Sequence, residues 1–214
     1  MTRSTPRTSA TVLRPLATPV PVGFLGLAVG ALVVAGLQLD WIGPYERHAV
    51  ALVLLAFAFP LQLIAALLGF RARDSAFATA MAVLAMAWLV EAGLLSAGRA
   101  PGGRHTLGLF LVAAAVALLV PLAASGRDKL AASAVIGCAA LRLALDGIHR
   151  LAGGAAWETA AGAAGLLLTV LALYAAAAFA LEDTRGRPVL PLGRHGSGAE
   201  EMEEGAEPGI RSLL

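Results

Sequence analysis

The sequence predicts an all-α membrane protein that crosses the bilayer six times as a bundle of helices. Hydrophobic residues make up 58% of the chain and charged residues only 14%, whereas a soluble domain carries about 25% charged residues. Six apolar runs alternate with short polar segments, and each run is near the roughly 20 residues that a spanning helix needs. Alanine and leucine dominate these runs, which favours helices over a transmembrane barrel.

The elements follow in order from the amino-terminal end. Residues 1–17 are rich in Thr, Ser, Arg and Pro, which predicts a disordered basic leader. We expect six helices, covering residues 21–39, 49–70, 75–97, 107–125, 130–141 with a polar continuation, and 159–181. They form a domain of residues 18–194. Residues 195–214 contain several glutamates and predict a disordered acidic tail.

The stretch 18–26 opens the first helix. Pro19 and Pro21 lack an amide N–H, so the helix start has fewer donors to satisfy. Three glycines follow at spacings of three and four: Gly23, Gly26 and Gly30. They share one face, where a neighbouring backbone can approach closely. Two interpretations stay open: the stripe serves helix packing alone, or the helix N-terminus helps to form a carboxylate pathway.

The second and third helices contain residues that are unusual in lipid. Pro60 interrupts the second helix, where a membrane bundle tolerates a proline that often kinks the helix. Gln62 lies half a turn beyond and should face the bundle interior, where it lines a pore or bonds a neighbouring helix. Glu91 is a functional candidate because a carboxylate at that depth is costly. It lies one to two turns from the helix end, however, so we expect it to snorkel to water.

The fifth helix carries four polar residues on one face: Arg142, Asp146, His149 and Arg150. One interpretation is a proton relay at the mouth of a pathway, in which His149 titrates. The interpretation that we favour is an Arg142–Asp146 pair that satisfies itself near the surface, with His149 and Arg150 among the lipid headgroups.

Lys and Arg residues indicate the orientation. If the N-terminus is cytoplasmic, the cytoplasmic segments hold eleven of them and the outer segments four. The positive-inside rule therefore favours both termini in the cytoplasm, which six helices allow.

Several function classes find no support. No Ser nucleophile elbow and no phosphate loop occurs, so we expect neither an enzyme nor an ATP-driven pump. The single cysteine, Cys138, lies in an apolar run and is expected to pack rather than to react. We expect no metal and no cofactor. Basic residues are scattered, which argues against nucleic-acid binding.

Two segments resemble the signatures of the acetate uptake transporter family. Thr18–Gly26 is similar to that family's Asn-Pro-Ala-Pro-Leu-Gly-Leu motif, with Thr18 at the position of Asn. Arg185–Gly193 is similar to its Phe-Gly-Arg-Thr-Val-Leu-Pro-Ile-Gly ending. A weaker match is Gln62 with the Ala-Ala-Leu-Leu that follows at 65–68. The resemblance covers roughly residues 16–194.

The resemblance implies uptake of acetate, or in some members succinate, by six-helix protomers assembled into hexamers. It implies a substrate pathway that includes Thr18, Pro19, Pro21, Gly23 and Gln62. The family's constriction consists of an aromatic residue, a tyrosine and a leucine on helices 1, 3 and 5. Spacing places these positions at Leu27, Leu84 and Ala139, none of which keeps the family residue. This departure predicts a wider or more apolar neck.

The leading hypothesis is therefore a multi-pass transporter or channel of the bacterial inner membrane. It would pass a small monocarboxylate such as acetate, either linked to protons or in a channel-like manner. A weak acid suits a pathway with few charges, since its proton lowers the cost of desolvation. Two alternatives stay open: an amide or urea channel, and a non-transporting membrane scaffold or sensor that acts through its acidic tail.

Overall fold

The computed structural model describes residues 11–13, 17–97, 103–125, 130–185, 187, 189–192 and 210–212. Within this part of the chain, six helical segments are long and apolar enough to cross a membrane. The predicted leader and tail fall mostly outside the described residues, as do Gly186, Pro188 and Gly193 of the second motif. The membrane-spanning part is all-helical, as predicted.

The helices are close to the predicted ranges. The spanning segments are α1 (Val20–Gln38), a composite second span, α4 (Ser75–Ser96), α5 (Arg104–Ala124), α6 (Leu130–Ala152) and α7 (Ala155–Arg185). The composite span comprises η1 (Pro44–Glu46), α2 (Arg47–Val53), η2 (Leu54–Ala58) and α3 (Phe59–Arg71). The main differences are the second span, which begins at Pro44 rather than near residue 49, and α7, which runs from Ala155 to Arg185 rather than over 159–181. Only Gly153 and Gly154, with φ of 78° and 94°, form the turn before it.

The proline in the second span is accommodated by one π-helical turn. Pro60 has no N–H to donate, and its ring crowds the carbonyl four residues earlier. The segment Leu54–Ala58 is π-helical, and the Phe59 N–H donates to the Leu54 carbonyl, five residues back. This wider turn precedes the proline and lets the span continue to Arg71 as one segment.

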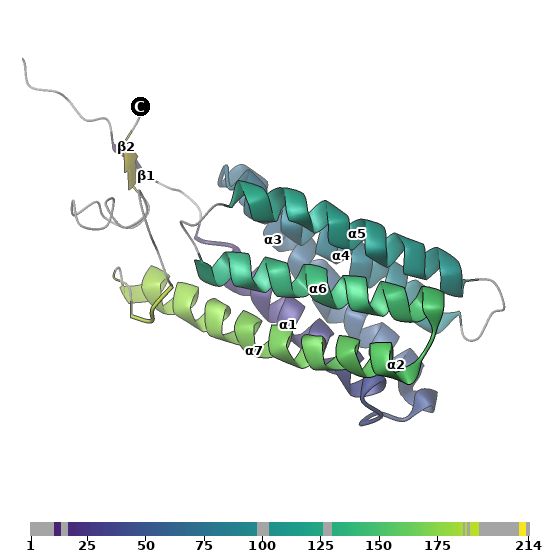
Figure 1. The fold of residues 1–214 in the computed structure, drawn as a ribbon. Helices are drawn as coiled ribbons and strands as arrows, with labels where there is room; N and C mark the ends of the chain where they lie inside the picture. The colour runs from purple at the N-terminus through teal and green to yellow at the C-terminus, as the bar shows by residue number, and fades with distance from the viewer. Residues whose placement is uncertain are drawn as a thin grey trace, which may run out of the picture.

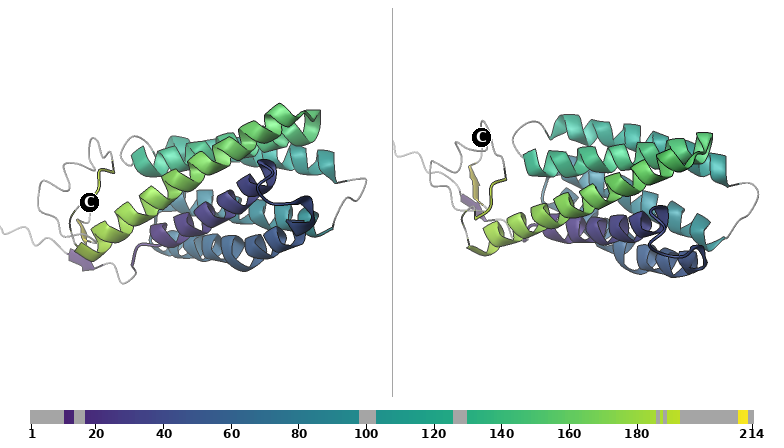
Figure 2. Two further views of the ribbon diagram at one scale, coloured as in Figure 1. Left: turned by 90° about the horizontal axis from the view of Figure 1, so that it is seen from below. Right: turned by 60° about the horizontal axis from the view of Figure 1, so that its bottom comes forward.

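The six spans close into a ring. Each packs most extensively against two neighbours, in the order α1, α3, α4, α5, α6, α7 and back to α1, and α1 also contacts α4 across the ring. Figure 1 shows the long helices running side by side, and Figure 2 shows α7 lying along α1, which closes the ring. Small residues make this closure tight, because a Cβ on Gly165 of α7 would lie 3.0 Å from the Ala35 Cβ of α1.

Both ends of the described chain lie at the same end of the bundle. Strand β1 (Thr11–Leu13) precedes α1 and pairs in antiparallel register with β2 (Ile210–Ser212), which follows α7. Figure 1 shows this two-stranded sheet beyond one end of the helices. An even number of spans likewise places the first and last helix ends on one side of the bundle. We refer to this end as the terminal end and to the opposite end as the far end.

Candidate functional site

The glycine stripe of α1 packs against α3 and α4. A Cβ placed on Gly23 would lie 2.8 Å from the Met81 Sδ and 2.9 Å from the Ala65 Cβ. One on Gly30 would lie 2.9 Å from the Ala58 Cβ. These separations leave no room for a side chain, so the close helix approach predicted from the glycine spacing is confirmed.

Gln62 lies on the inner side of this contact. Its side chain is fully buried, and its Nε2 donates to the Met81 Sδ at 3.6 Å. The Gln62 Oε1 has no hydrogen-bond partner among the described residues. The prediction that Gln62 faces the bundle interior is therefore confirmed. It lies beside the stripe, since a Cβ on Gly26 would contact its Cγ at 3.5 Å.

The other predicted residues of the α1 start lie next to this contact. Pro19 is buried, whereas Thr18 and Pro21 are half-buried. The three predicted constriction positions all belong to the hydrophobic core: Leu27, Leu84 and Ala139 are 0%, 2% and 1% exposed. Phe24 packs edge-on against Phe77 of α4, with ring centroids 5.8 Å apart.

A buried ion pair crosses the ring. Arg142 of α6 donates through Nη2 to the two carboxylate oxygens of Glu91 in α4, at 3.3 and 3.4 Å. The two side chains are 1% and 0% exposed. The Arg142 guanidinium carbon lies 4.8 Å from the ring centroid of Trp88, which is also buried. Because α5 stands between α4 and α6 in the ring, these contacts bridge its interior.

A second ion pair lies one helical turn further along α6. The Arg150 Nε donates to the Asp146 Oδ1 at 3.2 Å, and the Asp146 side chain is fully buried. Three polar atoms of this cluster have no hydrogen-bond partner in the part of the chain that the structure describes: Trp88 Nε1, Arg142 Nε and Asp146 Oδ2. We call Trp88, Glu91, Arg142, Asp146 and Arg150 the ionic cluster.

Polar contacts continue from the ionic cluster to the far end. His149 Nε2 lies 3.9 Å from a carboxylate oxygen of Glu158 in α7, and its Nδ1 lies 3.1 Å from the Gly154 carbonyl oxygen. Arg104 at the start of α5 donates to the His149 carbonyl at 3.0 Å. A file of polar groups thus runs along α6 from the far end to the ring interior.

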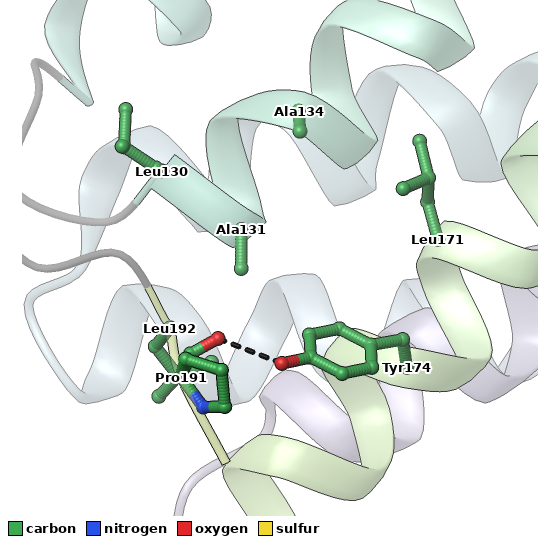
Figure 3. A pocket seen from close by; sticks show the side chains of 7 residues that line it. All are labelled: Leu130, Ala131, Ala134, Leu171, Tyr174, Pro191 and Leu192. Carbon is green, nitrogen blue, oxygen red and sulfur yellow. Dashed lines mark hydrogen bonds between the residues drawn. The ribbon is translucent and has the colours of Figure 1, made fainter.

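At the terminal end, residues of the second motif fold back over the helix ends. The Tyr174 Oη donates to the Pro191 carbonyl at 2.8 Å, and the Ala131 N–H donates to the Leu192 carbonyl at 3.2 Å. Beside these contacts lies an open, mainly apolar pocket, drawn in Figure 3, that is lined by Leu130, Ala131, Ala134, Leu171, Tyr174, Pro191 and Leu192. The motif therefore closes one corner of the bundle between α6 and α7.

Comparison with known proteins identifies the family. Residues 2–189 match the family model described as the GPR1/FUN34/yaaH family. The chain belongs to the GPR1/FUN34/yaaH family. This is the acetate uptake transporter family that the two end motifs resemble, a family of acetate transporters and channels rather than of enzymes. The chain is accordingly a multi-pass membrane protein.

One solved structure supports the fold in detail. "Structure of the bacterial acetate channel SatP" superposes on this chain with a TM-score of 0.76 and 24% sequence identity. The alignment covers 83% of this chain and 99% of that one. Among curated protein sequences, none matches this chain. The bundle described above therefore has the fold of a GPR1/FUN34/yaaH member.

Two predictions about charged residues are wrong. Glu91 does not snorkel to water, because Arg142 reaches it from across the ring and both side chains are buried. Asp146 pairs with Arg150 instead of Arg142. The shared face on α6 was correctly predicted, but the partner on α4 was not, because 51 residues separate it from Arg142 in sequence. Trp88 was missed, although its spacing of three before Glu91 places both on one face of α4.

Proposed function

We propose that this protein passes a small monocarboxylate of the acetate type across the membrane. The observation that carries the proposal is the family match over residues 2–189, on a chain whose six spans close into a ring. The solved structure with the same fold is described as an acetate channel. Passage is proton-linked or channel-like, and the solute moves through the interior of the ring.

The spacing of residues on α4 supports an interior pathway. Five bulky or polar residues recur at intervals of four and three along one face: Phe77, Met81, Leu84, Trp88 and Glu91. The first of these contacts Phe24 of α1, and the last two contact Arg142 of α6. Neither α1 nor α6 lies next to α4 in the ring, so this face is directed inward.

The same reasoning supports the proposed constriction. Leu84 lies on the inward face of α4, Leu27 lies one turn beyond Phe24 on α1, and Ala139 lies one turn before Arg142 on α6. We propose that these three side chains form an apolar neck. Thr18, Pro19, Pro21, Gly23 and Gln62 would shape the pathway on its terminal side.

We further propose that both termini are cytoplasmic, that the membrane is a bacterial inner membrane and that the protein forms homohexamers. The uneven distribution of Lys and Arg supports the orientation. Exposed apolar side chains on the outward faces, such as Leu109 and Val120 of α5 at 65% and 69% exposure, suit contact with lipid or with another protomer.

Uptake of labelled acetate into proteoliposomes tests the function. We expect acetate to accumulate faster with acidic external buffer than at neutral pH, because a proton accompanies the solute or the neutral acid crosses. Uptake equal to that of protein-free vesicles at every pH would refute the proposal. Stopped-flow swelling with urea tests the amide-channel alternative, since urea flux needs no pH gradient. Deletion of residues 195–214 tests the scaffold alternative, which requires the tail.

A further inference from the structure

We propose that the ring interior holds a binding site for the neutral, protonated form of a small monocarboxylic acid, built by Trp88, Arg142 and Asp146. The inference rests on the proposed function, because it names the form of the solute that is bound and the place at which the chain holds it. The site uses residues other than Gln62 and borders the glycine stripe only through the contact of Trp88 with Gly30.

The polar atoms available at this place are two donors and one acceptor. Trp88 Nε1 and Arg142 Nε each carry an N–H, and Asp146 Oδ2 is a carboxylate oxygen. None of the three has a hydrogen-bond partner among the described residues, and the three side chains are at most 1% exposed. Buried polar groups are normally paired, so three unpartnered atoms in one cluster indicate a ligand.

A protonated carboxylic acid supplies the complementary groups. Its carbonyl oxygen has two lone pairs that can accept from the Trp88 and Arg142 N–H groups. Its hydroxyl can donate to the Asp146 Oδ2. An ionised carboxylate has no O–H and would bring a second anionic oxygen to Asp146. The donor and acceptor set therefore selects the acid over its anion.

The charge of the cluster favours the same form. Glu91 pairs with Arg142 and Asp146 pairs with Arg150, so the two carboxylates are matched by two guanidinium groups. An added anion would leave one negative charge without a partner inside a membrane-spanning bundle, which is costly. A neutral acid adds no charge and needs only hydrogen bonds.

The cluster also lies where a solute in the ring would meet it. A Cβ on Gly30 of α1 would lie 3.0 Å from the Cζ2 of the Trp88 indole, while the other face of the cluster is on α6. The site therefore joins three helices around the interior. The polar file through His149 leads to it from the far end, and Leu84 precedes it on α4.

Trp88 provides a direct binding signal. It is 1% exposed, whereas the other two tryptophans, Trp41 and Trp157, are 65% and 42% exposed. In the full chain carrying Trp41→Phe and Trp157→Phe, Trp88 is the sole tryptophan. We expect its emission to change saturably when sodium acetate, but not sodium chloride, is added at pH 5. With a pKa of about 4.3, as for a glutamic acid side chain, the protonated share of the acid falls about eightyfold from pH 5 to pH 7. Half-saturation should therefore need correspondingly more total acetate at pH 7.

The pH comparison needs a control, because titratable and charged groups of the protein also face α6. These are Glu91 of α4, Arg104 of α5, Glu158 of α7 and, on α6 itself, His149 and Arg150. The titration is therefore repeated in His149→Gln, for which the same pH shift is expected. No acetate-dependent change in emission would overturn the proposal. Half-saturation at equal total acetate at both pH values, or a response to acetamide or urea alone, would overturn it as well.

Transport measurements separate this inference from the proposed function. Asp146→Asn replaces the acceptor Oδ2 by an N–H donor but leaves an oxygen for Arg150. We expect the KM for acetate uptake at pH 5 to rise at least about tenfold, as for loss of a hydrogen bond to a charged group. Asp183→Asn, at an exposed position of α7, is the control and should leave KM unchanged. Acetate uptake with an unchanged KM in Asp146→Asn contradicts the site alone, whereas absent uptake in the natural sequence contradicts the function.

Discussion

The ion pair between Glu91 and Arg142 should make a single neutralising substitution more harmful than removal of both charges. The nitrogen and oxygen lie 3.3 Å apart and both side chains are buried. At an effective dielectric constant of about 20, the Coulomb attraction at this distance is about 5 kcal/mol. In Glu91→Gln this attraction is lost while the Arg142 charge stays buried. Breaking a buried pair in this way costs about 3–5 kcal/mol.

The double variant Glu91→Leu/Arg142→Met removes the buried charge as well as the pair. Because replacement of a buried ion pair by apolar residues is often neutral or stabilising, we expect its unfolding free energy to lie within about 1 kcal/mol of the natural protein or above it. The assay is equilibrium unfolding in mixed micelles of a mild detergent and dodecyl sulfate, followed by circular dichroism. Glu46→Gln, at an exposed position of η1, is the control and should change stability by less than about 0.5 kcal/mol.

Two results would refute this reasoning. Glu91→Gln could unfold at the same fraction of dodecyl sulfate as the natural protein. This would mean that the Glu91 carboxylate does not compensate the buried charge of the Arg142 guanidinium. Alternatively, the double variant could be less stable than either single variant. In that case the two residues would contribute through packing against Trp88 rather than through their charges.

Four further substitutions test the packing and the pathway. Gly23→Ala should destabilise the bundle by about 1–3 kcal/mol, because its methyl group would overlap Met81. Gly93→Ala, where a Cβ meets no atom of the described residues within 4 Å, should instead stabilise α4 by up to about 1 kcal/mol in the same unfolding assay. Gln62→Leu should leave the unfolding free energy unchanged or higher, since it removes a buried amide whose oxygen has no partner among the described residues. Acetate uptake should fall in this variant, and unchanged uptake would exclude Gln62 from the pathway. Tyr174→Phe should cost about 1 kcal/mol and speed cleavage by trypsin after Arg185, which is followed by Gly186. Equal cleavage rates would show that the bond to Pro191 does not hold this segment.

The fold was predictable because its cause is local. Each span is an apolar run of nearly membrane length, and hydropathy detects such runs without knowledge of their partners. One error at a helix end concerns α7, where the predicted range of 159–181 left Trp157 and Glu158 outside the helix. They are helical because two glycines with positive φ complete the turn before them, and an acidic residue suits the first turn of a helix.

The candidate site was less predictable because its contacts are non-local. The polar face of α6 follows from spacing alone, but its pairing depends on how α4 and α6 are placed across the ring. Sequence reasoning assigned Asp146 to Arg142 because they are one turn apart; in the structure Arg142 reaches Glu91 and leaves Asp146 to Arg150. The π-helical turn was missed for a similar reason, since a proline predicts an interruption and not the geometry that accommodates it.

The inward face of α4 changes in character along its length, and this change bears on how a weak acid would cross. Toward the terminal end it presents Phe77, Met81 and Leu84, which offer no strong hydrogen-bond donor to an anion. Toward the far end it presents Trp88 and Glu91 within a cluster of balanced charge. An acetate ion would therefore find no free positive charge in the cluster and no donor beside the apolar residues, whereas the protonated acid would lose only hydrogen bonds on leaving the cluster. A site that binds the neutral form weakly, next to a neck that only the neutral form can pass, would allow both capture and release, which conduction requires.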